Sequence, residues 1–164
     1  MEANNQVLRN GKEFDRLSFV FQSLTGQEVE SFFFPGLKNR YKSGNGSAVT
    51  TTRSGEKLIL TYRNNLKSAE LEAEVLRILS QSLAPVPKLI SQKGRWLVQE
   101  FLGENRLTQA LNIRSSKWRT VLMERAICSL VRLQNVAREA GLHQIGKPIG
   151  ISSEWRKKRI SALN

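Results

Sequence analysis

The sequence predicts an α+β fold: a small antiparallel sheet of about five strands with one helix packed on it, preceded by a short helix and followed by a long helix. Two observations lead to this fold class. Apolar residues recur at spacings of three and four in separate segments, which is the period of a helix with one buried face. Between these segments lie short β-branched and aromatic runs joined by brief turns, which is typical of antiparallel hairpins.

The first helix is predicted over residues 12–24, and Gly26 stands where it would end. Its apolar face is formed by Phe14, Leu17, Phe21 and Leu24. Val29 and residues 32–34 then predict a buried strand, which Pro35 and Gly36 would interrupt.

The middle of the chain predicts a hairpin followed by a helix. Residues 43–47 read Ser-Gly-Asn-Gly-Ser, the composition of a flexible turn. The runs 48–52 and 57–62 are rich in β-branched and apolar residues, and Arg-Ser-Gly-Glu joins them as a hairpin turn would. A helix is predicted over 66–83, and the Pro-Val-Pro at 85–87 forces an extended exit from it.

A second hairpin and a long helix complete the predicted order. Strands at 89–90 and 96–101 would be joined by a turn at 91–94. Beyond Leu107 the chain becomes helical, most clearly over 117–140, with Gly141 as its stop. Cys128 lies in this helix, where we expect a small packed apolar side chain rather than a reactive thiol.

The predicted helices and strands divide the chain into four segments. Residues 1–27 hold the first helix, 28–103 the sheet with its packed helix, 104–143 a helical segment, and 144–164 a basic tail. The tail carries Arg-Lys-Lys-Arg at 156–159 and few apolar anchors.

The charge of the chain is uneven. It has 26 Lys and Arg against 14 Asp and Glu, a formal net charge of +12. Residues 1–82 contain 11 basic and 9 acidic residues, whereas residues 83–164 contain 15 and 5, so the excess is +2 and then +10. A basic half indicates attraction to a polyanion or to an acidic partner.

Scarce residue types exclude several classes of function. One Cys allows no disulfide within the chain, which favours a cytoplasmic location, and no apolar run is long enough to span a membrane. Asp15 is the only aspartate and His143 the only histidine, so a Ser-His-Asp triad and a metal-ligating cluster are not expected. A Walker A motif and a complete Gly-x-Gly-x-x-Gly are also missing from the sequence.

Five segments carry a resemblance to a known family through their order and spacing. They are Gly44-Asn45-Gly46-Ser47, residues 57–60, residues 71–76, Pro85-Val86-Pro87 and residues 97–103. Together they resemble the N-terminal lobe of the aminoglycoside phosphotransferase family, a kinase-like family. The likeness covers about residues 28–142. It implies a kinase-like N-lobe and ATP as the candidate cofactor.

The resemblance implies a phosphate-binding end of the site. Gly44, Asn45, Gly46 and Ser47 would bring backbone N–H groups close to the phosphates of a nucleotide. The family's phosphate-clamping lysine aligns with Thr61, so Arg63, two residues on and on the same strand face, is the cation that could replace it. Glu72 would orient this cation through an ion pair.

The resemblance also implies a connector that recognises adenine. The backbone C=O of Glu100 and the N–H of Leu102 would hold the adenine edge, with Gln99 behind it. Such recognition uses the main chain and therefore places few demands on side chains.

The catalytic half of the family pattern is missing. The family's second lobe supplies a His-Gly-Asp-type loop and an aspartate for magnesium, and neither is present here. We therefore expect a first lobe without its partner, with no catalytic residues, no metal ligands and magnesium not bound. Two other functions stay open: a nucleic-acid-binding module that uses the basic second half, and an adaptor that docks on another protein through helix 117–140.

Overall fold

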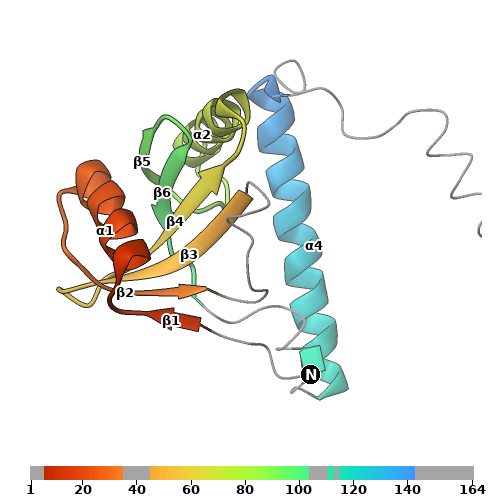
Figure 1. Ribbon diagram of the computed structural model, residues 1–164. Coiled ribbons are helices and arrows are strands. Elements are labelled where there is room, and N and C mark those ends of the chain that lie inside the picture. The colour runs from red at the N-terminus through yellow and green to blue at the C-terminus, as the bar shows by residue number, and fades with distance from the viewer. Residues whose placement is uncertain (1–5, 35–44, 104–110, 113–114, 143–164) are drawn as a thin grey trace, which may run out of the picture.

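The computed structural model describes residues 6–34, 45–103, 111–112 and 115–142. These residues form a six-stranded antiparallel sheet with helices on both of its faces (Figure 1). The strand order is β1-β2-β3-β4-β6-β5. The strands are β1 (Gln6–Leu8), β2 (Val29–Phe34), β3 (Asn45–Thr52), β4 (Lys57–Arg63), β5 (Leu89–Lys93) and β6 (Trp96–Glu100). The helices are α1 (Lys12–Thr25), α2 (Leu66–Gln81) and α4 (Ser116–Glu139).

The predicted α+β class is confirmed, and the sheet has one more strand than expected. The additional strand, β1, pairs with β2 over Gln6, Val7 and Leu8 at the edge of the sheet. Three residues are too few to show the alternating pattern by which a strand is recognised in a sequence. Leu8 packs against the core, which accounts for the docking of this short segment.

Helix α1 covers one face of the sheet with large apolar side chains. Leu17 and Phe21 of this helix pack in a buried cluster with Phe32, Leu60 and Val98 from three strands. Gly26 ends the helix in the left-handed conformation, with φ of +73°, and its N–H donates to the Gln22 carbonyl at 2.8 Å. The helix predicted over 12–24 is therefore confirmed.

Helix α2 covers the opposite face. Leu97 packs with Ala69 and Ala73 of α2, whereas its neighbour Val98 belongs to the α1 cluster. Since successive residues of a strand point to opposite faces, α1 and α2 lie on different sides of the sheet (Figure 1). This second face is built on small side chains, which let the helix lie close to the strands.

Two boundaries differ from the prediction by three residues. The strand expected at 48–52 begins at Asn45, so part of the Gly-Asn-Gly-Ser segment pairs with β4 instead of turning. The turn expected at 91–94 is shorter, because β5 continues to Lys93 and Gly94 then adopts a φ of +57°. The polar residues at 91–93 resemble a turn in composition, but an edge strand with a solvent-facing side accepts them equally well.

Helix α4 packs loosely against the rest of the fold. It contains no buried residue, and Met123, Ile127, Leu130 and Val131 are all exposed. Arg132 donates from Nη2 to the Leu83 carbonyl at 3.2 Å, next to the end of α2 (Figure 1). Large apolar side chains of α4 are thus exposed, as docking of helix 117–140 on a partner would require, and that docking stays a prediction. Cys128 is exposed, so the expectation of a packed side chain is wrong: the long helix has too little fold beside it to enclose that position.

None of the helices in the described part of the chain is long and apolar enough to cross a membrane. The basic tail predicted at 144–164, with its cluster at 156–159, lies outside the described residues. Its proposed contact with nucleic acid therefore stays a prediction, as do the predicted domain boundaries.

Candidate functional site

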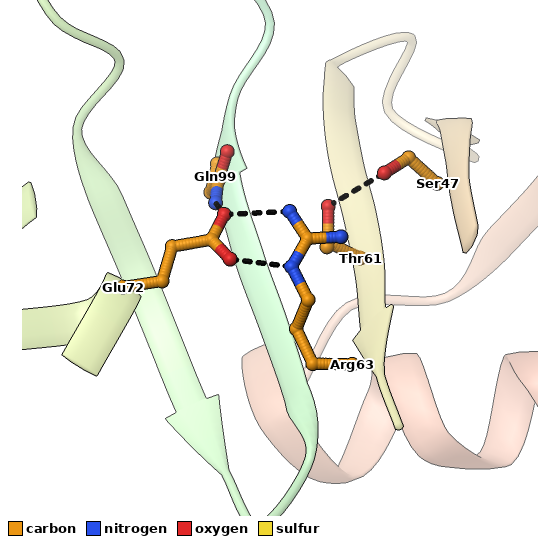
Figure 2. Close-up of polar contacts among 5 residues, drawn as sticks. All are labelled: Ser47, Thr61, Arg63, Glu72 and Gln99. Atoms are coloured by element: carbon orange, nitrogen blue, oxygen red, sulfur yellow. Dashed lines mark hydrogen bonds and ion pairs between the residues drawn. The ribbon is translucent and has the colours of Figure 1, made fainter. Parts of the chain in front are cut away.

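An arginine and a glutamate form a two-pronged ion pair between the sheet and α2. Arg63, at the end of β4, donates from Nε to Oε2 of Glu72 at 2.5 Å and from Nη2 to Oε1 at 2.9 Å (Figure 2). Each of the two side chains is 28% exposed. This geometry matches the planar fork of a guanidinium to both oxygens of a carboxylate, which fixes direction as well as distance.

Gln99 of β6 adds a third donor to the same carboxylate. Its Nε2 donates to Oε1 of Glu72 at 3.2 Å, and its side chain is buried (Figure 2). Oε1 of Glu72 therefore accepts two hydrogen bonds, one from β4 and one from β6. The carboxylate links the helix to two neighbouring strands.

Local structure explains why these side chains meet. Asn65 caps α2, with its Oδ1 accepting from the Lys67 N–H at 2.9 Å, so the helix starts directly after β4. Ala69 and Ala73 face the sheet, and Glu72 lies beside them at helical spacing. Leu97 and Gln99 are two residues apart on β6 and therefore share the face that α2 covers.

Thr61 occupies the position where the resemblance places a lysine. Its side chain is 2% exposed, and its hydroxyl shares a hydrogen bond with that of Ser47 at 3.1 Å. The two residues face each other in the β3–β4 pairing. Arg63 lies two residues further along the same strand face, so its guanidinium is displaced toward the end of β4 (Figure 2).

The predicted phosphate-binding turn is in part a strand. Asn45, Gly46 and Ser47 pair with Arg63, Tyr62 and Thr61, and Gly46 is not among the described glycines with positive φ. The expectation of a turn is therefore wrong for 45–47, because ladder pairing with β4 holds this backbone extended. Gly44 lies outside the described residues. The roles of Gly44, Asn45, Gly46 and Ser47 toward phosphate stay predictions.

The predicted connector begins where β6 ends. The N–H of Glu100 donates to the Lys88 carbonyl at 2.9 Å, and the Glu100 carboxylate accepts from the Lys88 N–H at 3.2 Å. Leu102 lies beyond the strand with 66% of its surface exposed, and Gly103 follows with a φ of +100°. The adenine-binding role of Glu100 and Leu102 stays a prediction.

Besides the bond between Ser47 and Thr61, sequence reasoning missed two contacts on this face. The first is the bond between Gln99 and Glu72, and the second is Lys57, whose Nζ lies 5.7 Å from the ring centroid of Phe101. The alternation of Lys57, Ile59 and Thr61 places Lys57 on the face that carries Arg63, which is the signal that could have found it. Within the described residues, no three His, Cys, Asp or Glu side chains gather as metal ligands would.

Comparisons with known proteins do not assign this chain to a family. No family model matches the sequence, and no curated protein matches it. Among solved structures, a chain described as a “putative fructosamine-3-kinase” from Thermobifida fusca YX-ER1 is similar, with 23% sequence identity and a TM-score of 0.45. The match covers 55% of this chain and 32% of the other, so this chain spans about a third of that protein's length. A similarity of this size assigns no family, and the function therefore rests on the geometry of the described residues.

Proposed function

We propose that the α2 side of the sheet binds a nucleotide, with Arg63 as the group that contacts its phosphates. The observation that carries this proposal is the two-pronged ion pair with Glu72. An arginine held in this way has already lost part of its rotamer freedom before a ligand arrives. Binding an anion then costs less conformational entropy.

The donor inventory of Arg63 fits a phosphate group. A guanidinium has five N–H donors, and the fork to Glu72 uses one on Nε and one on Nη2. The remaining donors lie on Nη1 and the outer side of Nη2, and Figure 2 shows the head group with Glu72 on one side and Thr61 on the other. Phosphate oxygens are suited to such paired, planar donors. Because the side chain is 28% exposed, a ligand has access to it.

The proposal is for binding without phosphoryl transfer by the described residues. Transfer needs a carboxylate to orient the acceptor hydroxyl and others to hold magnesium. Asp15 is the only aspartate of the chain, and it is exposed in the first turn of α1, on the face opposite Glu72. Glu72 is itself engaged by three donors and is not available as a base.

Calorimetric titration of the full chain with ATP tests the proposal, with and without magnesium. We expect saturable binding to the wild type, little dependence on magnesium, and at least about tenfold weaker binding by Arg63→Ala, since a charge-assisted hydrogen bond is lost.

Arg53→Ala is the matched control. Arg53 also pairs with a glutamate, Glu28, at 2.8 Å, but it is 73% exposed and lies at the other end of the β3–β4 hairpin. We expect it to bind ATP as the wild type does. A wild type that shows no saturable binding, or an Arg63→Ala variant that binds equally well, would contradict the proposal.

A further inference from the structure

The Glu72 carboxylate is oriented from two strands at once: two of its three contacts come from the cation and the third comes from Gln99. Gln99 is buried and lies on the strand next to β4, where it pairs with Ile59 across the sheet. Its amide donates to the oxygen of Glu72 that Arg63 Nη2 also contacts. The other oxygen accepts from Arg63 Nε.

A carboxylate on a helix can turn about its terminal bond, because torsions of this sp³–sp² type are broad. The two bonds from Arg63 do not prevent such a rotation, since a guanidinium on a long flexible stem can follow it. A third donor from a separate strand does prevent it. Gln99 is well placed for this, since its backbone belongs to an inner strand, paired on both sides, and its side chain is buried.

We propose that Gln99 is a positioning residue: its amide sets the plane of the Glu72 carboxylate, and thereby the direction in which the outer N–H groups of Arg63 point. Gln99 then acts on a ligand through Glu72 and Arg63, and not from behind the adenine edge, where the resemblance places it. This inference rests on the proposed nucleotide site for its effect on binding, but its effect on the ion pair is independent of any nucleotide.

The test begins without ligand. Gln99→Met keeps the length of the side chain and removes the donor. By NMR of the full chain, we expect the Nε proton of Arg63 to exchange with water several-fold faster in this variant than in the wild type. Gln92→Met is the matched control, because Gln92 lies in the same hairpin and also donates its amide, to the Gly94 carbonyl at 2.9 Å. In Gln92→Met, the Nε proton of Arg63 should exchange with water at the wild-type rate. Unchanged exchange in Gln99→Met overturns the inference.

The second arm measures ATP affinity by calorimetry. We expect binding to Gln99→Met to be about tenfold weaker, the effect of one lost hydrogen bond to a charged group. On a Glu72→Ala background the same substitution should have no further effect, because a residue that acts through Glu72 has nothing left to position. A merely structural glutamine would weaken both backgrounds equally, and that result contradicts the inference.

The two arms separate the possible failures. If the wild type binds no ATP, the proposed function is wrong, while the exchange measurement still decides whether Gln99 orders the ion pair. If exchange rises in Gln99→Met but ATP affinity is unchanged, Gln99 orders the pair without positioning it for a ligand, and the inference fails.

Discussion

The two faces of the sheet hold their helices by different means. On the α1 side, Phe21, Phe32 and Leu60 are fully buried and supply large apolar contacts. On the α2 side, the buried contacts are made by Ala69 and Ala73 with Leu97. The other contacts between α2 and the sheet include the polar ones of Glu72 with Arg63 and Gln99. Because the free energy of burial grows with apolar area, the first face contributes most of the stability. The α2 face buries less apolar area than the α1 face, and it brings charged groups close to the sheet.

The largest expected effect is on the α1 face. Phe21→Ala should lower the free energy of unfolding by about 3–5 kcal/mol, because it leaves a cavity among residues that cannot fill it. Denaturant unfolding of the full chain measures this change. Phe19→Ala is the control, since Phe19 lies on the same helix but is 75% exposed. Similar losses for the two variants would show that the α1 face is not the main source of stability.

A substitution under α2 should affect stability less and the site more. Ala73→Leu adds volume where the helix contacts Leu97, at a cost of about 1–3 kcal/mol in unfolding free energy. The helix would be pushed away from the sheet, separating Glu72 from Arg63, so we expect ATP affinity to fall as well. Chemical unfolding and calorimetry on one preparation measure both effects. If the variant is destabilised but binds ATP with wild-type affinity, the contact of α2 with the sheet does not control the site.

Breaking the Arg63–Glu72 ion pair should weaken ATP binding and leave the free energy of unfolding almost unchanged. Glu72→Gln should change the free energy of unfolding by no more than about 1 kcal/mol, because the pair is partly exposed to solvent. ATP binding should weaken about tenfold, since Arg63 loses the acceptor that orients it. The more exposed ion pair between Arg53 and Glu28 provides the control variant, Glu28→Gln. Thermal unfolding and titration would show whether the α2 face serves mainly the site.

The smallest effect is expected on α4. Ile127→Ser should change the unfolding free energy by less than about 0.5 kcal/mol, because Ile127 is 55% exposed and α4 has no buried residue. Denaturant unfolding tests this. A loss comparable to that of Phe21→Ala would mean that α4 is an integral part of the core.

The contrast also explains what could be predicted from the sequence. The α1 helix was correctly placed because Phe14, Leu17, Phe21 and Leu24 repeat at helical spacing and Gly26 ends the run. The short edge strand β1 was missed because three residues carry no period. The turn after β5 was placed too early because Ser, Gln and Lys at 91–93 have the composition of a loop.

The site was predictable only in part. Arg63 and Glu72 were paired through the family resemblance and the strand alternation, and the structure brings them together. The bond from Gln99 was missed because it depends on the lateral order of the strands and their register, in which β6 lies beside β4 and Gln99 opposite Ile59. Contacts of this kind join residues 27 positions apart, and local sequence patterns do not encode them.

The exposed sulfur of Cys128 has a practical consequence. It is the only thiol of the chain and lies on α4, outside the proposed site. A maleimide dye would therefore attach at one defined place with no engineering of the sequence. Energy transfer from that dye to a fluorescent nucleotide would report how far α4 lies from the ligand in solution, and whether that separation changes during binding.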